Sequence, residues 1–118
     1  MIRRPVYCKR SHRLLLRALK DAQNALQLRD WQITLDTGNY PSTEFLDSDN
    51  GTSTARSSFH ADLRTGLIWV SDRRAKQHKE DPLFNLYHEL GHFVLSVPDD
   101  ELNCNIIAKL LYDLREAK

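Results

Sequence analysis

The feature that most constrains the fold of this chain is a two-faced segment that begins at Pro82 and continues to about residue 96. Proline suits the first turn of a helix, and helical periodicity persists up to the Val-Pro pair at 97–98. At about 100° per residue, the large apolar residues share one side of this helix: Leu83, Leu86, Leu90, Phe93, Val94 and Val97. Such a helix must bury that side, so the rest of the chain has to supply a core around it.

Two histidines and a glutamate occupy the other side of the same helix. With His88 as origin, His92 lies at about 40° and Glu89 at about 100°, away from the apolar side. Imidazoles one turn apart can bind a single metal ion, and neutral imidazole is a common Zn²⁺ ligand. Gly91 lies on a third side, where the missing side chain lets another segment approach closely. The segment predicts a metal-binding helix; the alternative is a His pair that is only a surface feature.

The His-Glu-x-x-His pattern at residues 88–92 predicts a catalytic zinc site. A catalytic zinc ion has three protein ligands and one position for water, whose pKa it lowers towards about 7. A carboxylate beside that water can accept its proton and deliver it to the leaving amine of a peptide bond. Glu89 is not placed as a ligand. We expect it to be the general base of a zinc-dependent metallopeptidase that holds one Zn²⁺ per chain.

The third zinc ligand is expected from the helix that follows. A histidine six residues after His92 would mark another class of zinc peptidase, but a proline occupies that position. Three acids remain: Asp99, Asp100 and Glu101. Glu101 heads a strip of small residues on the predicted last helix, where another helix can pack closely, whereas Asp99 and Asp100 suit the cap of that helix. Glu101 is the preferred ligand, and the two aspartates are the alternatives.

The N-terminal half predicts a helix, a strand and a loop. Ser11 is a suitable cap, and helical periodicity continues from it to about Leu28. Residues 31–35 alternate between apolar and polar side chains, as in a strand. Polar residues with Gly and Pro fill positions 37–56 and predict a long polar loop.

The central residues predict a β-hairpin. Two strand-like runs, 59–63 and 67–71, are separated by a short segment that contains Gly66. A polar stretch follows and leads to the helix with the two histidines, and a last helix extends from about residue 99 to Glu116. The expected fold is α+β, with a small mixed or antiparallel sheet.

Length and composition indicate one soluble domain. The chain has 118 residues, 41% of them hydrophobic and 28% charged, which suffices for one core, so we expect a single domain over 1–118. No apolar run approaches the ~18 residues needed to cross a bilayer, and no export signal follows the basic start. Cys8 and Cys104 lie far apart, and we expect two reduced thiols in a cytoplasmic protein.

The net charge of +1 conceals a basic N-terminal region. Residues 1–20 carry seven of the 17 Lys and Arg residues and none of the 16 Asp and Glu residues, and residues 1–10 form a basic arm. Arg13, Arg17 and Lys20 share one side of the first predicted helix. We expect these charges to complement the acidic remainder of the chain. The alternative is that they bind an acidic partner or nucleic acid through counterion release.

From Leu67 onward, over about half its length, the chain resembles the ImmA/IrrE-type metallopeptidases of the gluzincin group. Three strings carry the resemblance: Leu-Ile-Trp-Val at 67–70, Phe-Asn-Leu-Tyr-His-Glu-Leu-Gly-His-Phe-Val-Leu at 84–95, and Glu-x-x-Cys-Asn-x-Ile-Ala-x-x-Leu at 101–111. The resemblance implies a zincin-like domain with His88, His92 and Glu101 as zinc ligands and Glu89 as base. The N-terminal helix followed by Trp-x-Ile-x-Leu is also similar to SprT-like and other minimal zincins.

Two functions follow from these observations. The first is an intracellular zinc endopeptidase that acts on a protein or peptide substrate. The second is a zinc-stabilised binding or regulatory protein that engages an acidic partner or nucleic acid through its basic N-terminal region. Glu89 favours the enzyme, because a purely structural zinc site has no need of a base.

Overall fold

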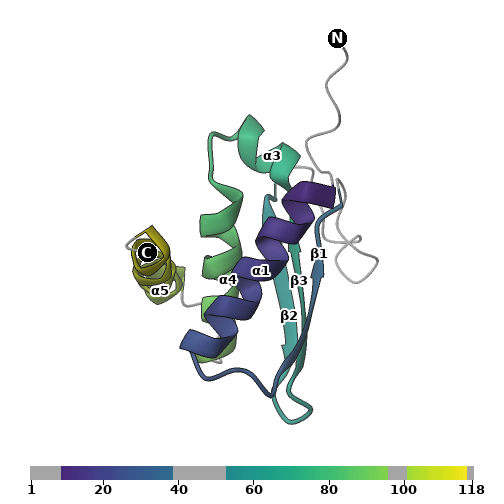
Figure 1. Ribbon diagram of the computed structural model, residues 1–118, viewed down its shortest axis with the longest axis vertical. Helices are drawn as coiled ribbons and strands as arrows, with labels where there is room; N and C mark the ends of the chain where they lie inside the picture. Colours follow the sequence, from purple (N-terminus) through teal and green to yellow (C-terminus); the bar gives the residue numbers. More distant parts are fainter. Residues whose placement is uncertain (1–8, 39–52, 96–100, 117–118) are drawn as a thin grey trace.

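The computed structural model describes residues 9–38, 53–95 and 101–116 (Figure 1). Its elements are, in order, α1 (Lys9–Ala25), β1 (Gln32–Asp36), β2 (Ala55–His60), β3 (Thr65–Val70), α3 (Asp72–Gln77), α4 (Pro82–Leu95) and α5 (Glu101–Glu116). These described residues form a small compact α+β fold with four helices and three strands, which confirms the expected class.

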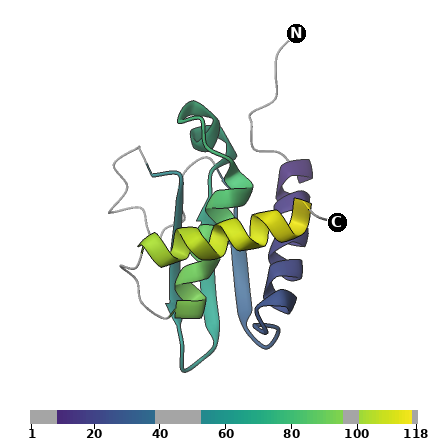
Figure 2. The same ribbon diagram turned by 90° about the vertical axis from the view of Figure 1, so that its left-hand side faces the viewer.

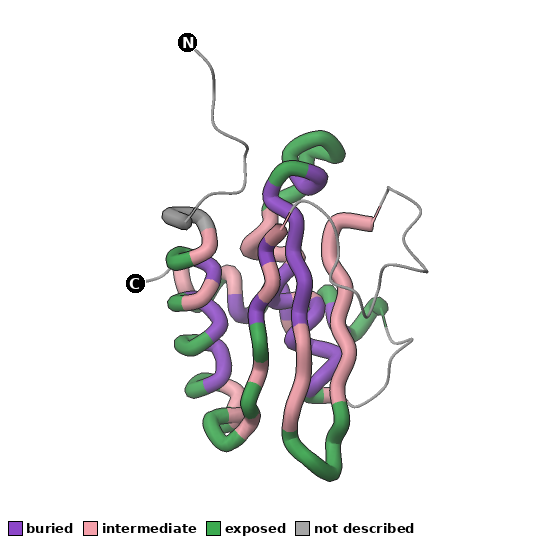
Figure 3. The backbone as a smooth tube through the Cα atoms, turned by 90° about the vertical axis from the view of Figure 1, so that its right-hand side faces the viewer, coloured by how far each residue is buried: buried purple, intermediate pink, exposed green. Residues whose placement is uncertain are grey.

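The three strands form one mixed sheet in the order β1-β3-β2. β1 pairs with β3 in parallel, with Thr34 opposite Leu67. β2 pairs with β3 antiparallel, with Ser57 opposite Ile68. β3 is therefore the central strand, and its C-terminal half is fully buried, whereas β2 is only partly buried along most of its length (Figure 3).

The helices form two layers beside the sheet. Figure 1 shows α1 and α4 next to the strands and α5 on the outer side of α4, and Figure 2 shows α5 crossing α4. The core lies between the sheet and the inner helices. Among its most buried apolar members are Ala18, Leu19, Ile68, Val70, Leu86, Leu90 and Phe93. The apolar side predicted for α4 supplies three of these residues. The side of α4 that carries the histidines therefore faces α5.

The hairpin exists, but the predicted boundaries of its strands are wrong. The strands occupy 55–60 and 65–70 rather than 59–63 and 67–71, and β2 takes the last two positions of the predicted loop over 37–56. The turn is at 61–64, where Arg64 has a positive φ of 52°. Gly66 lies inside β3, and a Cβ at this position would be only 2.1 Å from Cε2 of Phe93. This glycine marks a close approach within the core and not a turn.

The helices agree more closely with the predictions. α4 begins at Pro82 as expected, and the backbone N–H of Leu83 donates to Oδ1 of Asp81 at 2.9 Å. α1 starts ahead of Ser11 and ends before Leu28. The short helix α3 was not predicted from its polar sequence; Ser71 caps it by accepting a hydrogen bond from the N–H of Arg74 at 3.1 Å.

The basic side chains predicted to share one side of α1 are all exposed: Arg13, Arg17 and Lys20. Within the described ranges, no ion pair joins any of them to an acid. Most of the basic arm over 1–10 lies outside those ranges, as do Cys8 and most of the predicted loop over 37–56. Among the residues that the structure describes, no helix is both long and apolar enough to cross a membrane.

Candidate active site and metal centre

The close contact between α4 and α5 builds the site. A Cβ placed on Gly91 of α4 would lie 3.1 Å from Cα of Cys104 on α5. The small residues Cys104 and Ala108 are fully buried, whereas Leu102 and Leu110 on the opposite side of α5 are largely exposed. This confirms both the close approach predicted at Gly91 and the packing of the small-residue strip. It also brings the first turn of α5 over the histidines of α4.

The two histidines and Glu101 meet at this contact. The rings of His88 and His92 have centroids 5.2 Å apart. Oε2 of Glu101 lies 2.5 Å from Nε2 of His88, and Oε1 lies 3.5 Å from Nε2 of His92. The imidazole side chains are only 15% and 7% exposed, but the carboxylate side chain is 63% exposed. The three side chains predicted as metal ligands therefore converge, while Asp99 and Asp100 lie outside the described residues.

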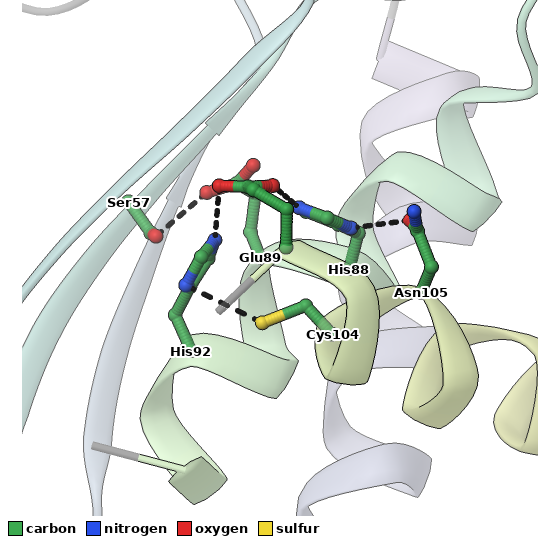
Figure 4. A network of polar contacts seen from close by, with 7 residues as sticks. Ser57, His88, Glu89, His92, Cys104 and Asn105 are labelled. Carbon is green, nitrogen blue, oxygen red and sulfur yellow. Dashed lines mark hydrogen bonds and ion pairs between the residues drawn. The ribbon is translucent and has the colours of Figure 1, made fainter. Parts of the chain in front are cut away.

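The other nitrogen of each imidazole is held by α5 (Figure 4). Nδ1 of His88 lies 2.7 Å from Oδ1 of Asn105, which accepts its hydrogen. Nδ1 of His92 lies 3.4 Å from Sγ of Cys104. With Nδ1–H donated to Asn105, Nε2 is the nitrogen of His88 that faces the carboxylate of Glu101. These contacts orient the rings in the way that supporting groups orient metal-binding histidines.

A second grouping of potential ligands shares the two histidines. Ligand atoms of His88, His92 and Cys104 all lie within 4.8 Å of one another, close enough to hold a metal ion. Cys104 is fully buried and lies on the Nδ1 side of the His92 ring, whereas Glu101 lies on the Nε2 side. Among the described residues, the group that could hold a metal ion therefore includes the buried thiol, while the exposed carboxylate of Glu101 lies on the other side of the His92 ring.

Glu89 lies beside this cluster and is largely buried. Only 9% of the residue is exposed, and its Oε1 accepts a hydrogen bond of 2.6 Å from Oγ of Ser57 on β2 (Figure 4). Burial raises the pKa of Glu89 above its ordinary value; the Ser57 hydrogen bond and the two imidazoles oppose this rise, and the carboxylate of Glu101 adds to it. A carboxylate with a raised pKa is suited to accept and return a proton.

Two hollows open beside Glu89. The larger has a volume of about 540 Å³ and is lined by Thr54, Ala55, Glu80, Asp81, Phe84, Asn85, His88, Glu89, Asn105 and Tyr112. The smaller has a volume of about 240 Å³ and is lined by Ala55, Arg56, Ser57, Phe59, Glu89, His92 and Glu101. The site is therefore accessible from two sides, with β2 contributing to both.

Sequence reasoning found the four central side chains but not the groups that support them. Asn105 follows Glu101 by one turn of α5, a spacing that could have indicated its role. Ser57 gave no such signal, because the predicted strand began two residues after it.

Comparisons of the chain with family models, curated proteins and solved structures found no match. The family resemblance therefore stays a prediction, and the function has to be argued from the geometry.

Proposed function

We propose that this protein is a zinc-dependent peptidase of zincin-like architecture, with His88, His92 and Glu101 as metal ligands and Glu89 as general base. One observation carries the proposal: a buried carboxylate with a raised pKa lies beside a His-His-carboxylate cluster without closing it. A structural zinc site is closed by four protein ligands and needs no adjacent base. A hydrolytic site needs both an open position and a base.

Glu101 fits the role of third ligand better than Cys104. One carboxylate of Glu101 faces the Nε2 atoms of both imidazoles, 2.5 Å from that of His88 and 3.5 Å from that of His92, and the shorter distance would have to lengthen when a metal ion binds. Ligand atoms of tetrahedral zinc lie about 3.3 Å apart, close to the 3.5 Å between Glu101 and His92. Cys104 instead meets the nitrogen of His92 that faces away from Glu101, which suits a supporting contact.

The side chains around the cluster perform the proton transfers. When bound, Zn²⁺ would supply a Lewis acid for the substrate carbonyl and a water of lowered pKa. Ser57 donates to Oε1 of Glu89 and holds this carboxylate in place, which leaves Oε2 to accept a proton from water. Because burial raises the proton affinity of Glu89, the same carboxyl group retains the proton long enough to return it to the leaving amine.

The sheet edge next to the site suits an extended peptide substrate. In the described part of the chain, β2 pairs with β3 on one side and with no strand on the other. Ala55 and Ser57 of β2 line the hollows next to Glu89. A peptide can pair with an exposed strand through its backbone, which would bring its carbonyl groups beside the cluster. We therefore propose a protein or peptide substrate, met in the cytoplasm.

Hydrolysis assays with matched variants test the proposal. Metal-free protein is reloaded with zinc and incubated with an unfolded protein substrate. We expect one zinc ion per chain and zinc-dependent cleavage by the wild type, with cleavage reduced at least ~100-fold in Glu89→Gln, which keeps the metal. Glu101→Ala is expected to lose zinc affinity, and the control Asp113→Ala, at an exposed acid of the same helix, is not.

Equal cleavage by wild type and Glu89→Gln, or cleavage without metal, would contradict the proposal. Zinc binding without any cleavage would instead favour the zinc-stabilised binding protein. In that case the exposed basic residues of α1 become the next surface to test against an acidic partner or nucleic acid.

A further inference from the structure

The larger hollow beside Glu89 has a one-sided charge. Three carboxylates, those of Glu80, Asp81 and Glu89, contribute to its lining, and no Lys or Arg is among its described lining residues. Its remaining walls include two aromatic rings, Phe84 and Tyr112, with centroids 6.3 Å apart. The hollow thus combines negative charge at its acids with an apolar surface at its two aromatic rings.

Neutral groups hold the two outer carboxylates in place. Oε1 of Glu80 accepts hydrogen bonds from Oγ1 of Thr54 at 2.8 Å and from Nδ2 of Asn85 at 3.0 Å. Oδ2 of Asp81 accepts a hydrogen bond of 2.6 Å from the hydroxyl of Tyr112. Among the described residues neither carboxylate forms an ion pair, so their charges are oriented but not neutralised.

We propose that this hollow is a specificity subsite for a lysine or arginine side chain of the substrate, with Glu80 and Asp81 as the residues that select it. The inference rests on the proposed peptidase function, because the hollow shares His88 and Glu89 with the candidate active site. A side chain that enters it therefore belongs to a residue close to the bond that is cleaved.

The shape and chemistry of the hollow match such a side chain. Lysine and arginine combine an apolar stem with a charged end, and the stem can pack on Phe84 and Tyr112 while the end reaches the two acids. Aromatic faces also attract cations directly. A bare divalent cation fits less well, because calcium takes six to eight oxygen ligands and a volume of about 540 Å³ is far larger than an ion.

The smaller hollow, on the other side of Glu89, has a mixed charge, because Arg56 lines it together with the carboxylates of Glu89 and Glu101. Arg56 contributes to its lining, where its guanidinium donates to Oγ of Ser53. A basic substrate side chain would meet the like charge of Arg56 there, whereas the larger hollow has carboxylates and no Lys or Arg among its described lining residues. The preference for a basic residue is therefore expected on one side of the cleaved bond and not on both.

The test uses variants that remove charge but keep shape. The double substitution Glu80→Gln and Asp81→Asn preserves the hydrogen-bond acceptors, and asparagine can still cap α4. The control is Asp21→Asn with Asp62→Asn, which changes net charge equally at two exposed acids that line neither hollow. The substrates are a peptide mixture randomised around the cleaved bond and a matched peptide pair with Lys or Gln at the preferred position.

We expect the wild type and the control to prefer the Lys peptide by about tenfold in kcat/KM, and increasing salt to reduce this preference. Because each exposed ion pair contributes little alone, both acids are replaced together. In this double variant the two peptides are expected to differ by no more than about twofold in kcat/KM. Glu80→Lys is expected to shift selection towards acidic residues. Cleavage with no preference in the wild type, or with a preference unchanged in the double variant, would overturn the subsite but leave the peptidase intact.

A binding measurement separates this inference from the proposed function. The Lys and Gln peptides carry a fluorophore, and their affinity for Glu89→Gln is measured by anisotropy, with and without the two charge substitutions in the hollow. Suppose that the wild type cleaves neither peptide, but that the Lys peptide binds more tightly than the Gln peptide and the two charge substitutions abolish this difference. That result would support the subsite for a basic side chain and contradict the peptidase. Equal binding of the two peptides would reject the subsite, whatever the outcome of the cleavage assay.

Discussion

Replacing Gly91 with alanine would test the helix contact on which the site depends. The added Cβ would lie 3.1 Å from Cα, 3.3 Å from Cβ and 3.4 Å from Sγ of Cys104. The first two of these neighbours belong to a fully buried position of α5 and cannot rotate away. The strain is relieved only if α5 moves outwards by a few tenths of an ångström, and Glu101 moves with it.

The size of the effect follows from two opposing contributions. Overpacking of a tight contact costs about 1–3 kcal/mol. Alanine is favoured over glycine within a helix by about 1 kcal/mol, which offsets part of that cost. We therefore expect Gly91→Ala to lower the free energy of unfolding by about 1 kcal/mol, which lowers Tm by about 3–6 °C in a domain of this size.

Thermal unfolding and zinc titration measure the two consequences together. The control is Val94→Ala, a substitution on a more exposed side of the same helix that also introduces alanine. We expect Gly91→Ala, but not the control, to lower both Tm and zinc affinity, because only the former displaces α5. A Gly91→Ala protein as stable as the wild type, with unchanged zinc affinity, would refute the argument that this contact positions Glu101.

Three further predictions concern separate parts of the molecule. Since burial raises the pKa of Glu89, ionising it costs stability in the folded protein; the metal-free Glu89→Gln variant should unfold at a higher temperature than the wild type at neutral pH, and the difference should vanish below the ordinary pKa of 4.5. A difference that does not depend on pH would contradict this. Asn105→Ala removes the acceptor of an imidazole Nδ1–H and should weaken zinc binding by roughly 10–100-fold in a competition titration, without loss of fold. The triple substitution of Arg13, Arg17 and Lys20 by glutamine should leave Tm nearly unchanged, because none of them forms an ion pair with a described residue; a clear loss of Tm would restore the expectation that they stabilise the fold.

The elements with local signals were predictable from the sequence. Pro82 and a continuous apolar side gave the start and orientation of α4, and the spacing of His88, Glu89 and His92 gave three site residues on one turn. The small-residue strip of α5 indicated a close helix contact, and it placed Glu101 on the side that faces the histidines. In each case, neighbours along one helix carried the information.

The remaining features depend on contacts between distant segments. Gly66 was interpreted as part of the turn, but it lies inside β3, where Phe93 packs against it, so the predicted boundaries of the hairpin strands were wrong. The same error hid Ser57, whose contact with Glu89 spans 32 positions. The Nδ1 partners of the histidines, Asn105 and Cys104, also emerge only when the two helices are brought together.

The donor set of the metal tests the central claim most directly. X-ray absorption at the zinc edge of the metal-loaded protein distinguishes sulfur from nitrogen and oxygen by distance. With His88, His92 and Glu101 as ligands, we expect only nitrogen and oxygen neighbours at about 2.0–2.2 Å. A sulfur neighbour at about 2.3 Å would contradict the account, because it would assign the ion to Cys104 and leave Glu101 outside the metal site.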